Sequence, residues 1–226
     1  MNRIRLLAAV LALAPLPVAA QTTEDAQAWV NITVQGSIKD RLIYFAEVQP
    51  RFSDRADGLG TLLLRPAVGW QVSPQVSVYQ GYARVISPVD GGRDLAEHRP
   101  FQQLTWVPPH GAASEIQLRT RLEERWRNDG GQMGLRLREF VRAEGAFARS
   151  GKGVRALVST ELFIALKDTD WGNRAGFDQL RSFAGVEVPL FGRSTAEIGY
   201  LNQLIDQPGP ARRVNHVGVL NVFIRH

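Results

Sequence analysis

The chain has 226 residues, of which 44% are hydrophobic and 22% charged, so it suits a single folded domain with a large apolar surface. That balance excludes a disordered chain, and 21 glycines and 12 prolines without a repeating period exclude a collagen-like fold. No cysteine is present, which excludes disulfide scaffolds, cysteine-ligated zinc and thiol catalysis. The net charge of +5 is too small to indicate a nucleic-acid partner.

The first twenty residues have the pattern of a secretory signal peptide. Two arginines precede the apolar run 6–14, and prolines and small residues follow up to Ala20. The run is far shorter than the roughly 20 residues that a membrane-spanning helix needs, and no later segment is apolar enough for one. We therefore predict a signal peptide over 1–20 and a single domain over 21–226.

The rest of the chain alternates between apolar and polar side chains with a period of two, which predicts β-strands. Ala28, Val30, Ile32 and Val34, for example, share one face of the first run. In chain order the runs are 28–35, 42–51, 61–72, 75–86, 96–107, 115–126, 134–143, 155–166, 177–188, 194–204 and 213–224. The runs 75–86 and 96–107 alternate less cleanly than the others. Glycine- and proline-containing turns separate the runs, so we expect one meander of antiparallel strands.

Periodicity alone does not say whether the apolar faces point inward, as in a soluble barrel, or outward, as in a transmembrane barrel. Three features favour the transmembrane barrel. Runs of about ten to twelve residues match the ~9–11 residues of a tilted membrane strand. The polar faces carry glutamate and arginine, and 24 of the 27 basic residues are arginine, which pairs well with carboxylates in confined places. Trp70, Trp106 and Trp126 lie on the apolar faces at segment ends, where an interfacial aromatic girdle belongs.

We therefore expect an all-β, antiparallel up-and-down transmembrane β-barrel of about 10–12 strands, located in the outer membrane of a Gram-negative bacterium. Eleven runs do not fit the even strand numbers of bacterial single-chain barrels, so either a weak run hides a pair or an interruption, or the first run stays outside the wall. Ile224, Arg225 and His226 follow Phe223, whereas such barrels usually end on an aromatic residue.

The expected partners are outer-membrane lipid and the barrel-assembly machinery. A soluble periplasmic lipocalin-like binder is the alternative.

A series of short motifs, in order along the chain, resembles a known family. The motifs are Trp29, Glu47-x-Gln49-x-Arg51, Arg65-Pro66, Gly81-Tyr82, Glu97-His98-Arg99 with Gln102-Gln103, Arg121-Leu122-Glu123-x-Arg125, Gln179-x-Arg181 and Gly199-Tyr200-x-Asn202-Gln203. The chain is similar, from Trp29 to Phe223, to the outer-membrane β-barrel proteins grouped as domain of unknown function 2490. The resemblance implies a barrel in the cell envelope and implies no activity.

If the apolar faces contact lipid, the charged faces must line the lumen, because each arginine at mid-membrane would cost ~2–4 kcal/mol. The expected lumenal network comprises Glu47, Gln49, Arg51, Arg65, Glu97, Arg99, Arg121, Glu123, Arg125, Arg138, Glu161 and Arg181. Neighbouring strands would interleave these charges as ion pairs, and we expect Arg121 and Glu123 each to pair with charges on neighbouring strands rather than to act in catalysis. Two interpretations stay open: a salt-bridged plug that fills a small barrel, or a channel or pocket for small anionic solutes.

A lipid-modifying enzyme, such as an acyl hydrolase, is a further alternative. His98 and His216 are the histidines within strands, and Ser159 and Ser182 are strand serines that could serve as nucleophile. No Gly-x-Ser-x-Gly or His-Glu-x-x-His motif occurs, so we assign no catalytic residue, cofactor or metal. The segment 168–173 has acidic spacing like a calcium loop but lacks the closing glutamate, so we expect a solvated loop tip.

Overall fold

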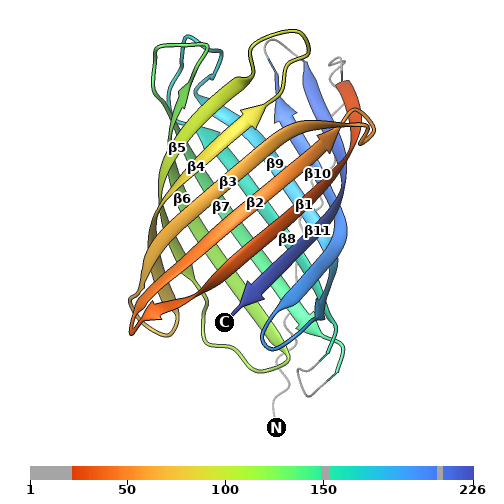
Figure 1. Cartoon of the computed structure of the whole chain (residues 1–226). Helices are drawn as coiled ribbons and strands as arrows, with labels where there is room; N and C mark the ends of the chain where they lie inside the picture. Colours follow the sequence, from red (N-terminus) through yellow and green to blue (C-terminus); the bar gives the residue numbers. More distant parts are fainter. Residues whose placement is uncertain (1–21, 149–152, 208–210) are drawn as a thin grey trace.

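The computed structural model describes residues 22–148, 153–207 and 211–226, which form a closed β-barrel (Figure 1). Its strands are β1 (Thr22–Lys39), β2 (Leu42–Ser53), β3 (Gly58–Gln71), β4 (Val76–Ser87), β5 (Leu95–Trp106), β6 (Ser114–Arg127), β7 (Gly134–Ala146), β8 (Arg155–Ala165), β9 (Gly176–Pro189), β10 (Thr195–Asp206) and β11 (Arg212–Arg225). The predicted signal peptide lies outside the described residues. Within the described ranges, no helix is long and apolar enough to cross a membrane.

The wall is a meander in which each strand pairs with its sequence neighbours, so the expected all-β up-and-down barrel of 10–12 strands is confirmed. Every such pair is antiparallel. The closing pair differs, because Thr22–Gln35 of β1 runs parallel to Arg212–Arg225 of β11. A meander with an odd number of strands can close in no other way, since its first and last strands point in the same direction. The first run therefore does join the wall.

The barrel has two rims, which we name after the strand ends that they hold. The N-terminal rim contains the start of β1 and the connections 54–57, 88–94, 128–133 and 166–175. The C-terminal rim contains the end of β11 and the connections 40–41, 72–75, 107–113 and 190–194. In Figure 1 the arrows of β1 and β11 both point to the C-terminal rim, at the bottom of the view.

The alternation of the sequence becomes an inner and an outer face. On β3, Leu63 and Arg65 are buried, whereas Leu64 and Val68 are 40% and 51% exposed on the outside. The large outward side chains include the predicted girdle, with Trp70 and Trp106 near the C-terminal rim and Trp126 near the N-terminal rim. The two weakly alternating runs are the regular strands β4 and β5. Their contrast is weak because small or apolar residues also point inward; a Cβ at Gly81 on β4 would overlap the Phe101 ring of β5.

The lumen is filled by apolar as well as charged side chains. One cluster joins Trp29, Leu157, Phe183, Val217 and Val219 from β1, β8, β9 and β11. A second cluster joins Phe45, Ala67 and Phe101. Apolar rings therefore accompany the expected charged residues in the lumen, because a narrow barrel packs side chains across its interior as a soluble core does.

The connection between β2 and β3 is a strained turn on the N-terminal rim. Asp54, Arg55 and Ala56 have φ values of 52°, 57° and 64°, which L-residues rarely adopt. The Asp25 carboxylate of β1 accepts the backbone N–H groups of Asp54 and Arg55, both at 3.2 Å. Asp25 therefore supports a turn that contains no glycine among its three left-handed residues.

Candidate functional site

The middle of the lumen holds a buried ion-pair layer centred on Glu123. Its Oε2 accepts from Arg136 Nη2 at 2.6 Å, and its Oε1 accepts from Arg138 Nη1 at 2.5 Å. Arg138 also donates to Glu161 Oε1, as does Arg119, each at 2.6 Å. Glu123 is 1% exposed and Arg138 4% exposed, so neighbouring guanidiniums replace water as partners of both carboxylates.

Arg121 lies in the same layer but differs from the expectation of a carboxylate partner. Its Nε donates to the Gln103 Oε1 of β5 at 2.9 Å, and its guanidinium carbon lies 4.4 Å from the centre of the Phe101 ring. The nearest carboxylate oxygen, Oε1 of Glu123, is 3.8 Å from Arg121 Nη1. Arg121 is thus held mainly by an amide and an aromatic ring.

Separate ion-pair groups lie closer to the two rims. Toward the N-terminal rim, Glu97 binds Arg99 at 2.6 Å and Arg125 at 2.5 Å. Toward the C-terminal rim, Arg142 on β7 binds three carboxylates. These are Glu144, Glu187 and Glu197. The Glu97 group has two arginines for one carboxylate, whereas the Arg142 group has more carboxylates than arginines, so a net positive charge remains toward the N-terminal rim and a net negative charge toward the C-terminal rim.

Two cavities occupy the lumen on either side of this layer. The C-side cavity measures about 320 Å³ and reaches Phe223 and Arg225. The N-side cavity measures about 280 Å³ and reaches Glu97 and Arg127. Four arginines line both cavities and therefore lie between them; we call them the waist. They are Arg51, Arg65, Arg138 and Arg181.

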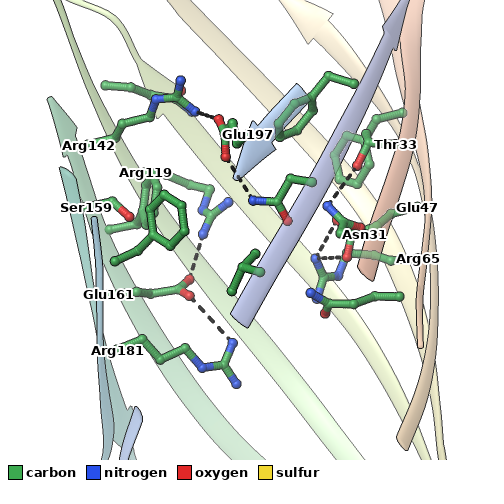
Figure 2. Close-up of a pocket in the computed structure, with 18 of the residues that line it drawn as sticks. Asn31, Thr33, Glu47, Arg65, Arg119, Arg142, Ser159, Glu161, Arg181 and Glu197 are labelled. Atoms are coloured by element: carbon green, nitrogen blue, oxygen red, sulfur yellow. Dashed lines mark hydrogen bonds and ion pairs between the residues drawn. The ribbon is translucent and has the colours of Figure 1, made fainter. Parts of the chain in front are cut away.

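Figure 2 shows how the C-side cavity is walled. Arg119, Glu161 and Arg181 lie together on one wall, and Glu47 with Arg65 faces them from the other. Arg65 Nη1 binds both oxygens of Glu47, at 2.9 and 3.0 Å. Arg181 is held more loosely, with its Nη1 3.9 Å from Glu161 Oε2. The guanidiniums of Arg65 on β3 and Arg181 on β9 thus face the same C-side cavity from opposite walls.

Arg51 is the waist arginine without an ion pair in the described residues. It donates to Oε1 of Gln49 at 2.6 Å, and its guanidinium carbon lies 4.0 Å from the centre of the Trp29 ring. The Arg181 guanidinium carbon lies 5.0 Å from the centre of the same ring. Both distances allow a cation–π interaction. Two cations from β2 and β9 therefore share one indole on β1.

The twelve residues predicted for the lumenal network all come from inward-facing positions, and they separate into the groups just described. Sequence reasoning left out Arg136, although it shares the inward parity of Arg138 within the run 134–143. It also left out Asp178, which binds Arg136 Nη1 at 2.9 Å. Trp29 stood on the polar parity of its run, but no sequence signal links it to Arg181 on β9.

The segment 168–173 is more structured than the expected solvated loop tip. The Asp170 carboxylate accepts the backbone N–H groups of Gly131 and Gln132 at 2.8 and 3.2 Å, which lowers the pKa of that carboxyl below its ordinary value. Trp171 donates from its indole N–H to the Gln132 carbonyl at 2.8 Å. Asn173 is buried and accepts from Arg125 Nη1 at 3.3 Å. This segment ties two connections of the N-terminal rim together over the lumen wall.

The histidines and serines considered for catalysis lie apart. On the outer face, His98 contacts Tyr82, and the His216 Nδ1 lies 2.6 Å from the Tyr200 hydroxyl. Ser159 lines the C-side cavity, inside the barrel (Figure 2). In the register, Ser182 pairs with Asn202 of β10 rather than with His216 of β11. Within the described residues, no serine contact to either histidine supports the hydrolase alternative.

Together these features define a closed β-barrel with a charged, largely filled lumen. The chain belongs to the family described as "Protein of unknown function (DUF2490)", whose model matches residues 26–215. It is 44% identical over 209 residues to an uncharacterized protein of Methylorubrum extorquens, a match that covers 92% of this chain and 90% of that protein. Among solved structures it is similar to the NanC porin, with a TM-score of 0.49 and 12% identity, over 82% of this chain and 89% of that chain.

Proposed function

We propose that this protein is an outer-membrane β-barrel of a Gram-negative bacterium whose lumen admits small anionic solutes. The membrane location is supported by the outer face, where aliphatic residues stand between tryptophans near each rim. Polar groups on that face pair with one another. Gln102 donates to Gln80 at 3.2 Å, and Thr120 donates to Glu139 at 2.8 Å, which reduces the cost of placing them against lipid.

The proposed preference of the lumen for anions rests on the excess of arginine side chains along the cavities. Twelve arginines line the two cavities: Arg51, Arg65, Arg99, Arg119, Arg121, Arg125, Arg127, Arg136, Arg138, Arg142, Arg181 and Arg225. Among the described residues, five carboxylates line them, and three more bind these arginines from beside the cavities, which leaves the arginines in excess. The five are Glu47, Glu97, Glu161, Asp178 and Glu197, and the three are Glu123, Glu144 and Glu187. A confined space with this imbalance has a positive potential that concentrates anions and repels cations. The waist places four of these cations where a solute would pass from one cavity to the other.

The test of passage is ion selectivity in a planar lipid bilayer. With a potassium chloride gradient across the bilayer, we expect a reversal potential of the sign that chloride permeability gives. Arg51→Glu should lower the ratio of chloride to potassium permeability severalfold, because it reverses one waist charge. Arg84→Glu is the matched control, since Arg84 lies on the outer face of β4 and should leave the ratio unchanged. Cation selectivity of the unmodified barrel would overturn the proposed preference.

The test of location is extraction of the protein from cell envelopes. We expect it in the outer-membrane fraction, soluble only with detergent, and with a gel mobility that changes on heating because the closed barrel unfolds. Recovery as a soluble periplasmic monomer without detergent would contradict the membrane proposal and favour the lipocalin-like binder.

A structural plug is the second candidate function, and the filled middle of the lumen favours it. Phe101, Arg121, Glu123 and Phe163 are each at most 1% exposed, so side chains occupy the space between the two cavities. Folded barrels that carry no current in the bilayer experiment would support the plug and overturn passage.

A further inference from the structure

We propose that the waist contains a binding site for a small oxyanion, a carboxylate or a phosphate group, between Arg51 and Arg181 beside Trp29. The inference rests on the proposed function in one respect, because the anion must reach the lumen. It goes further in predicting saturable binding at named residues, rather than a diffuse preference for anions.

Arg51 and Arg181 are incompletely neutralised by carboxylates of the described residues. Arg51 has no ion pair in the described residues, and its guanidinium lies against the same Trp29 ring as that of Arg181. Arg65 has its own carboxylate in Glu47, whereas the one carboxylate near Arg181 among the described residues is Glu161, at 3.9 Å; Arg181 otherwise donates to the Gln179 amide at 3.3 Å. Burying like charges together is unfavourable unless an opposite charge compensates them. A bound anion would supply that charge where the chain does not.

Several guanidinium N–H groups around the C-side cavity have no hydrogen-bond acceptor. In the described part of the lumen, the Nε atoms of Arg65, Arg119 and Arg181 and the Nη1 atom of Arg121 are buried without a hydrogen-bond partner. All four arginines line the C-side cavity. A buried guanidinium N–H without an acceptor is costly, and an oxyanion brings several acceptors at once. Asn31 Oδ1, an acceptor in the same cavity, also has no partner, but it is a single amide oxygen, whereas a carboxylate or phosphate would bring several acceptors to these N–H groups.

The Trp29 ring orients the guanidiniums of Arg51 and Arg181. The Trp29 ring is 3% exposed, and its Nε1 donates to Gln27 Oε1 at 2.8 Å, which fixes the indole. Guanidiniums that contact a fixed ring hold their planes in place, and less conformational entropy is lost when an anion binds. A cavity of about 320 Å³ beside them has room for a small organic acid.

The experiment is calorimetric titration of the detergent-solubilised protein with citrate and, in a separate arm, with inorganic phosphate, at constant ionic strength set with sodium chloride. We expect saturable binding of at least one probe. Arg51→Gln and Arg181→Gln should each weaken it about tenfold or more. Arg51→Lys should weaken it by less than Arg51→Gln, because lysine keeps the charge but loses the planar pair of donors. Arg84→Gln removes the same charge from the outer face and should leave the affinity unchanged.

Several outcomes would overturn the site. These are the absence of saturable binding for both probes, equal weakening by Arg84→Gln, or unchanged affinity in both folded waist variants. The heat-dependent gel mobility of each variant confirms that it is folded, and Arg181→Gln replaces Arg51→Gln if the latter does not fold. If the barrel is anion-selective but binds neither probe, the proposed passage of anions is supported and the binding site is contradicted. If the barrel binds a probe but carries no current, the binding site is supported and the proposed passage is contradicted.

Discussion

Arginine has different surroundings in two neighbouring regions of this lumen. Around Glu123, the guanidiniums of Arg136 and Arg138 share buried carboxylates at ordinary ion-pair distances. Beside Trp29, Arg51 has an amide and a ring as partners, and Arg181 has a distant carboxylate. The number of carboxylates within reach therefore decides whether an arginine is neutralised within the wall or keeps an uncompensated charge. We call the first region the paired layer and the second the Trp29 pair.

The largest effect should come from Glu123→Ala, because it leaves Arg136 and Arg138 without their shared carboxylate. We expect the free energy of unfolding to fall by ~3–5 kcal/mol, the usual cost of an uncompensated buried charge. Urea titration of the barrel in lipid vesicles measures it. Glu124→Ala is the control, since the neighbouring side chain is on the other face of β6 and should change little. An unchanged unfolding midpoint for Glu123→Ala would show that the paired layer is not structural.

The same substitution at one arginine of each region should sharpen the contrast. Arg138→Gln removes hydrogen bonds to Glu123 and Glu161, so we expect a loss of about 2–3 kcal/mol. Arg51→Gln removes a cation–π contact and a bond to Gln49, and we expect a loss of at most about 1 kcal/mol. Equal losses at the two positions would contradict the distinction between the regions.

The sequence predicts most of the wall, because alternation depends only on which face each residue presents. The eleven predicted runs correspond to the eleven strands of the described residues, and the inward orientation of Arg65 and Glu123 follows from the alternation. The sequence does not predict that β1 begins as early as Thr22, since the residues from Thr22 to Gln27 show no apolar alternation. Those residues are strand because Arg212–Val217 of β11 supplies a parallel partner, and a pairing between chain ends leaves no local pattern.

The candidate site was predictable as a set of residues but not as a set of partners. Cross-strand ion pairs such as Glu47 with Arg65 follow from adjacent strands, and they formed. Arg121 donates its hydrogen bond to Gln103 rather than to a glutamate, because Gln103 lies directly opposite it on β5. The convergence of Arg181 on Trp29 depends on curvature across the lumen, and periodicity contains no information about it.

A smaller effect should come from the rim, where charge is not the issue. Ala56 adopts a φ of 64°, so replacing it with glycine removes a steric penalty. We expect Ala56→Gly to raise the free energy of unfolding by about 0.5–1 kcal/mol. Asp57→Gly, at the neighbouring position, is the control for the added flexibility of the unfolded chain and should not stabilise. A loss of stability in Ala56→Gly would mean that the turn is not strained in solution.

The smallest effect concerns pH and the carboxylate of the rim connection. Hydrogen bonds from Gly131 and Gln132 lower the pKa of Asp170 from its ordinary value of 3.8. A lowered pKa in the folded state gives stability that is present above 3.8 and is lost as the pH falls through the lower folded value. Amide exchange of Gly131, corrected for its intrinsic pH dependence, should therefore stay constant from about pH 5 to pH 8. Asp170→Asn should speed that exchange, and an unchanged rate would contradict the bond.

The odd number of strands has a consequence for protein engineering. A meander with an even number of strands returns to the side on which it began, so both chain ends share one compartment. Here β1 starts on one rim and β11 finishes on the other. In the proposed membrane, a peptide fused before Thr22 and another fused after Arg225 would be displayed to opposite compartments by one folded chain. An epitope at each end, read by antibodies on intact and on opened cells, would therefore report the orientation of the barrel without altering its wall.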